Sequence, residues 1–159
     1  MRKIRPGDVA VFNFPRGRDR EKIEFRINYV YAKRCIGCPG DTVGIDAGFY
    51  YNTRFPGRIF GSVSMQDALR GMSDDVLKGM LEYVAAIPYS PEFGWTVRDF
   101  GPMYIPGKGG RIAVDTSSVR LYSRMMEYET GVLPEICGDK VYLGGRHITE
   151  YEFSSDWYF

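Results

Sequence analysis

The spacing of turn residues is the feature that most limits what this chain can fold into. In the first 54 residues, four runs rich in β-branched and aromatic residues are each closed by glycine, proline, aspartate or asparagine: 9–14, 25–36, 42–45 and 49–52. Short runs of this kind between turn signals predict β-strands. We expect the four strands to form a meander. With 19 Gly and 9 Pro in 159 residues, the chain does not have the composition of a helical bundle.

Helices are predicted inside the second part of the chain. Apolar residues recur at helical spacing from Ser73 to Val84, and Ser64 can cap a short helix before them. A further helix is expected with its N-cap in the stretch Asp115-Thr116-Ser117-Ser118 and its end at Gly131. These segments predict short helices inserted into a β-rich chain.

Further β-structure is expected near the end of the chain. A hairpin of residues 140–143 and 146–153 is predicted across Gly144-Gly145, whereas residues 88–110 are predicted to be extended chain and loops. We therefore predict a mainly β fold, that is, β-rich α+β with a few short helices. Residues 1–54 would form one part and residues 55–159 a larger, β-rich part with the helical insertion.

Charge and hydropathy narrow the range of partners. The chain has 21 Lys and Arg against 20 Asp and Glu, a net charge of +1, so it has no basic footprint for nucleic acid. Its sequence contains no apolar run of the length that crosses a bilayer, which predicts a soluble chain. Nothing in the sequence calls for a cofactor.

Two cysteines, Cys35 and Cys38, stand three positions apart in the block KRCIGCPGD. If the strand continued through both, their Cα atoms would be about 10 Å apart and the side chains would point to opposite faces, beyond the roughly 7 Å limit for a disulfide. Only a sharp bend at Gly37 would bring them together. We expect both cysteines to be apolar filler, with thiol redox chemistry or a zinc site as the alternative.

Lys33 precedes these cysteines and shares one strand face with Tyr31 and Cys35. Burial between an aromatic ring and a thiol would favour the neutral amine, which can accept a proton from a nucleophile. The alternative is a strand lysine whose ammonium group reaches solvent.

Two blocks in order resemble a known family. Residues 28–41 (NYVYAKRCIGCPGD) are similar to the lysine motif of type I signal peptidases, and residues 5–15 (RPGDVAVFNFP) to the strand that precedes that motif. More weakly, Tyr104-Ile105-Pro106, residues 121–131 and residues 141–159 resemble the larger non-catalytic region of such peptidases from Bacteroidetes-type bacteria.

The resemblance implies a serine endopeptidase with a Ser/Lys dyad that removes signal peptides from exported proteins. The full-length protein would be anchored in the bacterial inner membrane, with its catalytic domain on the periplasmic side. Lys33 would be the general base, supported by the motif residues Arg34, Gly37, Pro39, Gly40 and Asp41. The strand residues Asn28, Tyr29, Val30 and Tyr31 would bind the signal peptide as an added strand.

The family's nucleophile lies in a Ser-Met-x-Pro motif before the lysine, and this sequence has no such motif there. Ser64-Met65 follows the lysine and is succeeded by Gln66-Asp67 instead of a proline at the required place. We therefore expect an inactive fragment that lacks the membrane anchor, the nucleophile and the last catalytic segment. A signal-peptidase-like binding or interaction module without catalytic activity is the other interpretation.

Overall fold

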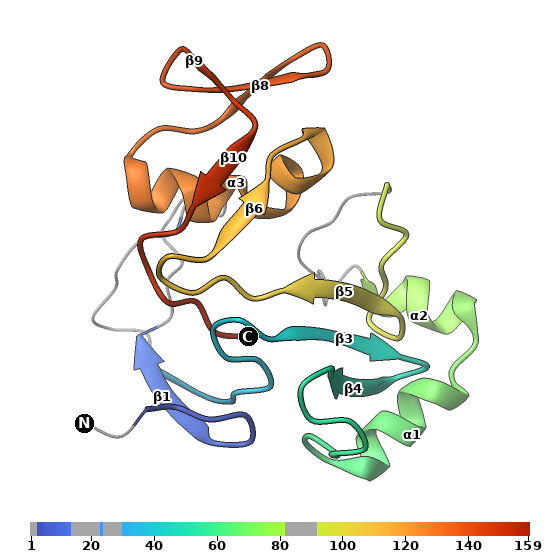
Figure 1. Ribbon diagram of the computed structural model, residues 1–159. Coiled ribbons are helices and arrows are strands. Elements are labelled where there is room, and N and C mark those ends of the chain that lie inside the picture. Colours follow the sequence, from blue (N-terminus) through green and yellow to red (C-terminus); the bar gives the residue numbers. More distant parts are fainter. Residues whose placement is uncertain (1–2, 14–22, 24–29, 82–91) are drawn as a thin grey trace. The chain divides into compact units, whose positions relative to one another are not determined.

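The computed structural model describes residues 3–13, 23, 30–81 and 92–159 (Figure 1). The described part contains ten short strands in four small sheets, and three helices. This confirms the prediction of a mainly β fold with a few short helices. The chain divides into two compact units. Unit 1 comprises Met1–Asp8, Arg34–Ile105 and Trp157–Phe159, and unit 2 comprises Val9–Lys33 and Pro106–Asp156. The predicted boundary after residue 54 stays a prediction.

The first two strands form a sheet of their own. β1 (Val9–Asn13) pairs with β2 (Val30–Arg34), as the two runs of β-branched and aromatic residues predict. The predicted second strand extended to Ile36, but β2 ends at Arg34. The expected four-stranded meander is also wrong, because β2 does not pair with the third strand.

The main sheet of unit 1 has the strand order β4-β3-β5. β3 (Thr42–Asp46) forms a hairpin with β4 (Phe49–Asn52), and its other edge pairs with β5 (Phe100–Tyr104). The hairpin turn places Ala47 and Gly48 at positive φ, the backbone of a type I′ turn. Val43 of β3 is fully buried opposite Met103 of β5. Both edges of β3 are therefore occupied, one by β4 and the other by β5.

β5 corrects the prediction that residues 88–110 are only extended chain and loops. Phe100 and Met103 are buried, and Ile105 just beyond the strand is 1% exposed. The turn signals Gly101 and Pro102 lie inside this strand. A proline is tolerated on an edge strand, which is where β5 lies.

Two helices follow β4. α1 (Val63–Gly71) begins at Ser62, whose hydroxyl accepts a hydrogen bond from Met65 N, so the predicted cap at Ser64 is wrong by two residues. Gln66 of α1 is buried; its Oε1 accepts from Tyr50 N at 2.9 Å and its Nε2 donates to Phe60 O at 2.9 Å. These bonds hold α1 against β4. α2 (Asp74–Leu81) buries Leu77 as the periodicity predicts, and the predicted continuation to Val84 lies outside the described residues.

Unit 2 is organised around α3 (Thr116–Thr130). Its two ends confirm the sequence prediction: Asp115 forms a capping box with Ser118, and Gly131 adopts the left-handed conformation at the C-cap. Val119, Tyr122 and Met126 of α3 are buried. Together with Val114, Val141 and Phe153 they form the buried apolar set of this unit.

The strands of unit 2 that follow β5 in the sequence form two small sheets. β6 (Arg111–Ala113) pairs with β10 (Glu150–Glu152), and β8 (Lys140–Leu143) lies between β7 (Glu135–Cys137) and β9 (Arg146–Ile148). The predicted hairpin across Gly144-Gly145 is present as β8 and β9. Its second arm is shorter than predicted, because the chain changes sheets between Ile148 and Glu150.

Candidate active-site loop

Lys33 lies on β2, one residue before the strand ends. Its side chain is exposed, and its Nζ is 5.8 Å from the centre of the Tyr31 ring. The predicted neighbourhood of Lys33 and Tyr31 on one strand face is therefore observed, but burial of the lysine is not. Arg34 follows, and its guanidinium donates to Gly7 O at 2.7 Å.

Residues 35–41 form a fixed loop between β2 and β3. On one side Cys35 N donates to Asp8 O and Gly7 N donates to Cys35 O. On the other side Gly40 N donates to Ile105 O at 2.8 Å. The loop backbone is therefore bonded at both ends to other segments of unit 1.

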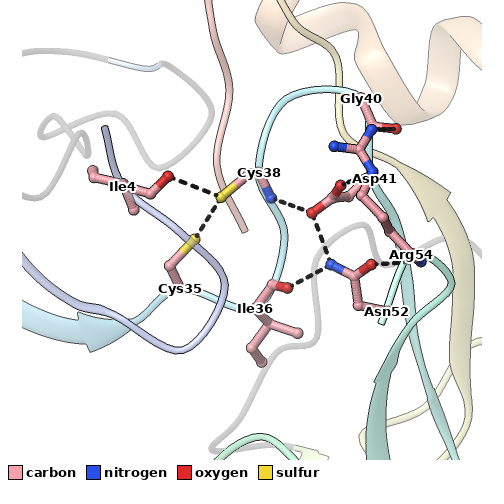
Figure 2. A network of polar contacts seen from close by, with 8 residues as sticks. All are labelled: Ile4, Cys35, Ile36, Cys38, Gly40, Asp41, Asn52 and Arg54. Carbon is pink, nitrogen blue, oxygen red and sulfur yellow. Dashed lines mark hydrogen bonds and ion pairs between the residues drawn. The ribbon is translucent and has the colours of Figure 1, made fainter. Parts of the chain in front are cut away.

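The carboxylate of Asp41 is the buried centre of this loop (Figure 2). Its Oδ2 accepts hydrogen bonds from Cys38 N at 3.0 Å and from Asn52 Nδ2 at 2.8 Å. Its Oδ1 lies 3.1 Å from Arg54 Nε, an ion-pair distance without the alignment of a hydrogen bond. Asn52 Nδ2 also donates to Ile36 O at 2.9 Å. One asparagine thus joins both halves of the loop to the end of β4.

The glycines of the loop have different roles. A Cβ on Gly37 would lie 2.7 Å from Val43 Cγ1 and 3.0 Å from Ile105 Cγ1, so only glycine lets the loop lie so close to the sheet. Gly37 also exchanges backbone hydrogen bonds with Phe159. Gly40 has φ of +85°, the left-handed conformation of the Pro39-Gly40 turn.

The two cysteines are placed differently from the expectation. Because β2 ends at Arg34, the alternation of strand faces does not reach Cys38. The sulfur atoms of Cys35 and Cys38 lie 3.7 Å apart (Figure 2), so the prediction of opposite faces is wrong. Both are free thiols; Cys35 is buried and Cys38 is half-buried.

The surroundings of both thiols raise their pKa and so favour the protonated form. Burial raises the pKa of the Cys35 thiol to about 12, aided by its hydrogen bond to Cys38 and by nearby Asp41 and Asp8. Burial also raises the pKa of the Cys38 thiol, but the Cys35 hydrogen bond opposes this shift. Cys38 Sγ lies 3.4 Å from Ile4 O, to which it can donate.

A recess of about 550 Å³ opens beside Cys38 in unit 1. Four cationic side chains line it: Lys3, Arg5, Arg54 and Arg58. Asp41 is the carboxylate in its wall. Arg58 is held over two aromatic rings, 5.8 Å from the centre of Phe55 and 5.4 Å from that of Phe60. The recess therefore has an excess of positive charge.

Residues 1–76 match the family model described as signal peptidase, peptidase S26. Over these residues the chain is similar to signal peptidases of the S26 family. The match contains the whole lysine block and the strand before it, and the family consists of serine endopeptidases. Searches of curated proteins and of solved structures gave no match.

The predicted substrate strand within the matched residues 1–76 is only partly described. Val30 and Tyr31 are exposed on β2, whereas Asn28 and Tyr29 lie outside the described residues.

None of the described helices has the length and apolarity to cross a bilayer. Within residues 3–13, 23, 30–81 and 92–159, no group of three His, Cys, Asp or Glu side chains could hold a metal ion.

Two residues that contact Asp41 were not predicted from the sequence. Asn52 and Arg54 contact Asp41 but lie after the lysine motif, at and beyond the end of β4. The available signal was a polar residue closing the aromatic run Phe49-Tyr50-Tyr51. A buried polar side chain at such a place needs a partner, although its sequence position does not say which partner.

Proposed function

We propose that this chain is part of a type I signal peptidase in which Lys33 is the general base that activates a serine nucleophile. The observation that carries the proposal is the S26 match over residues 1–76, which includes Lys33 and the loop that follows it. The loop that follows Lys33 in the matched motif is itself well ordered, because the backbone of Cys35 is hydrogen-bonded to Asp8 and Gly7.

The chemistry would proceed in two steps. The neutral Lys33 amine takes the proton of a serine hydroxyl, and the serine oxygen attacks the carbonyl carbon at the cleavage site. The expelled amine receives that proton, and an acyl-enzyme remains. The same amine then takes a proton from water, whose oxygen attacks the ester and releases the serine. The serine would come from a segment outside residues 1–159, since the required Ser-Met-x-Pro motif is not among them.

Lys33 must lose its proton before it can act. Its ammonium is exposed here, and burial is the physical cause that would lower its pKa. Packing of the nucleophile segment and the bound peptide over β2 would supply that burial. On this proposal the 159-residue chain has no peptidase activity of its own.

The signal peptide would bind as an added strand beside β2. Val30 and Tyr31 are exposed, and β1 and β2 form a two-stranded sheet by themselves. An extended peptide can pair with a free backbone edge and place alternate side chains in pockets. The parent protein would work at the periplasmic face of the inner membrane, where signal peptides emerge.

Cleavage of a preprotein by the product of the full reading frame tests the assignment of Lys33. We expect Lys33→Ala to lower kcat/KM on the order of 10³-fold, since the general base is lost, and Lys33→Arg to do the same, because a guanidinium stays protonated. Lys140→Ala, an exposed lysine on β8, is the matched control and should leave cleavage unchanged. Retained cleavage with Lys33→Ala would exclude Lys33 as the base.

The 159-residue chain should not cleave the same preprotein at any concentration. Turnover by this chain that disappears with Lys33→Ala would show that the nucleophile lies inside residues 1–159 and would overturn that part of the proposal.

A further inference from the structure

The two thiols of the loop, Cys35 and Cys38, have no role in the proposed peptidase reaction. They lie close enough to each other to be considered as a possible disulfide. Cys35 Sγ and Cys38 Sγ are 3.7 Å apart. A disulfide bond requires about 2 Å, so a small side-chain adjustment would join them. The adjoining backbone is held by Asp8, Phe159 and Asp41. The loop therefore keeps the two sulfur atoms together.

The basic recess offers a way to one of these thiols. Cys38 lines the recess together with Lys3, Arg5, Arg54 and Arg58. Two carboxylates lie near the thiols, Asp41 in the recess wall and Asp8 close enough to raise the pKa of both thiols. The cations still outnumber the carboxylates by four to two. A positive recess attracts a negatively charged reactant and repels a cationic one.

We propose that Cys35 and Cys38 are a redox pair that is closed to a disulfide by an anionic low-molecular-weight disulfide bound in the basic recess. This inference concerns residues that take no part in the proposed peptidase reaction and does not depend on it. The class of reactant is a small disulfide with carboxylate groups, such as glutathione disulfide.

The reaction balances as two thiol–disulfide exchanges. The Cys38 thiolate attacks one sulfur of the bound disulfide, whose S–S bond breaks and expels a thiolate that takes up the proton released by Cys38. The Cys35 thiolate then attacks the Cys38 sulfur of the mixed disulfide and expels the second thiol, which receives the proton of Cys35. Two electrons and two protons pass to the reactant, which leaves as two thiols.

Exposure sets the order of these steps. Cys38 is half-buried and lines the recess, whereas Cys35 is 5% exposed. Cys38 is therefore the attacking thiol and Cys35 the resolving one. Because burial disfavours both thiolates, they are poor leaving groups, and the disulfide should open slowly once formed.

The test uses the 159-residue chain with Cys137→Ser, which removes the exposed third cysteine on β7. Glutathione disulfide at about pH 8 should convert both remaining thiols to one intramolecular disulfide. Trypsin releases residues 35–54 as one peptide that contains both cysteines and no internal Lys or Arg. We expect that peptide to be lighter by two hydrogens. Two free thiols, or a stable mixed disulfide with glutathione, would overturn the proposal.

Docking of the reactant in the basic recess can be tested by comparing an anionic with a cationic disulfide. At low salt the anionic glutathione disulfide should oxidise the pair about tenfold faster than the cationic disulfide cystamine, and about 0.5 M salt should remove most of that difference. The double substitution Lys3→Gln and Arg5→Gln should reduce this difference in rate between the two disulfides. Arg70 is exposed on α1 and lies outside the recess, so Arg70→Gln should leave the difference unchanged. Equal rates for the two reactants would rule out docking in the recess.

Single variants test the order of attack. Cys35→Ser should accumulate a mixed disulfide on Cys38, because the resolving thiol is missing. Cys38→Ser should react at least about tenfold more slowly, because the remaining thiol is buried. The reverse pattern would contradict the assignment of Cys38 as the attacking thiol.

Discussion

The side-chain amide of Asn52 donates a hydrogen bond of 2.8 Å to the buried carboxylate of Asp41, and the same nitrogen donates to Ile36 O at 2.9 Å. One amide therefore connects the start of β3, the end of β4 and the loop between Lys33 and β3. A carboxylate in such a position is costly unless its donors are present. The loop is held by this buried polar network at least as much as by its turn residues.

Asn52→Ala should lower the free energy of unfolding by about 2–3 kcal/mol, because it removes a donor from a buried charged group. Urea denaturation of the 159-residue chain measures the loss. In an Asp41→Asn background the effect of Asn52→Ala should shrink by at least about 1 kcal/mol. Strict additivity of the two substitutions would show that Asn52 acts through contacts other than Asp41.

Gly37→Ala should destabilise the chain by about 1–3 kcal/mol, because the added Cβ would collide with Val43 and Ile105. Gly79→Ala is the matched control on α2, where a Cβ meets no atom of the described residues within 4 Å. That change should stabilise the chain by about 0.5–1 kcal/mol, since alanine is the better helix former. Thermal unfolding measures the Tm of both variants. A shift of Tm in the same direction for the two variants would contradict the predicted collision at Gly37.

Stability should fall in mild alkali because of Cys35. Its folded pKa of about 12 lies above its unfolded value, near 8.5, so the folded chain keeps a proton that the unfolded chain loses. Between these values the unfolding free energy should fall by about 1.4 kcal/mol per pH unit from this one group. Urea titrations between about pH 7 and 10 measure the slope. Cys35→Ala should have a shallower slope, and parallel slopes would refute the linkage.

Glu129 of α3 should matter far more than its neighbour Glu127. Its carboxylate accepts from Tyr151 OH at 2.9 Å, Ser154 N at 2.9 Å and Ser155 N at 3.0 Å, and so joins α3 to β10 and to the segment after it. Glu129→Ala should cost about 2–4 kcal/mol. Glu127→Ala loses only the i,i+3 ion pair with Arg124 and should cost less than about 0.5 kcal/mol. Similar losses for the two variants would contradict this distinction.

Lys33→Ala should leave the stability of the 159-residue chain within about 0.5 kcal/mol of the original, because the side chain is exposed and lies on a strand. Urea denaturation checks this expectation. The result separates loss of activity in the full-length variant from loss of folding. A destabilisation above about 2 kcal/mol would give Lys33 a structural role that its exposure does not indicate.

The elements that could be predicted are those specified by local sequence. α3 has its cap residues Asp115 and Gly131 at both ends, and both ends are as predicted. The β3–β4 hairpin follows from the alternation and turn of residues 42–52. In these segments the chemistry that sets the boundary lies within a few residues of it.

The elements that could not be predicted depend on partners far along the chain. β5 contains Gly101 and Pro102, which locally favour a turn, and it forms because β3 offers an edge for pairing. The end of β2 at Arg34 brings Cys35 and Cys38 together. The Asp41–Asn52 bond requires the hairpin to be folded before the two side chains meet. The role of Lys33 was inferred from a motif, and its exposed side chain alone would not have indicated it.

The β1–β2 sheet also has a consequence for the solution behaviour of the chain. It displays apolar side chains to solvent: Val9 and Val11 of β1 are 57% and 71% exposed, and Val30 of β2 is 63% exposed. Among the described residues no third strand pairs with this sheet, and exposed β-branched residues beside an unpaired strand edge favour pairing with other chains. Without a peptide on this sheet, concentrated samples should therefore aggregate through β1 and β2, and a charged substitution at Val11 should suppress that aggregation.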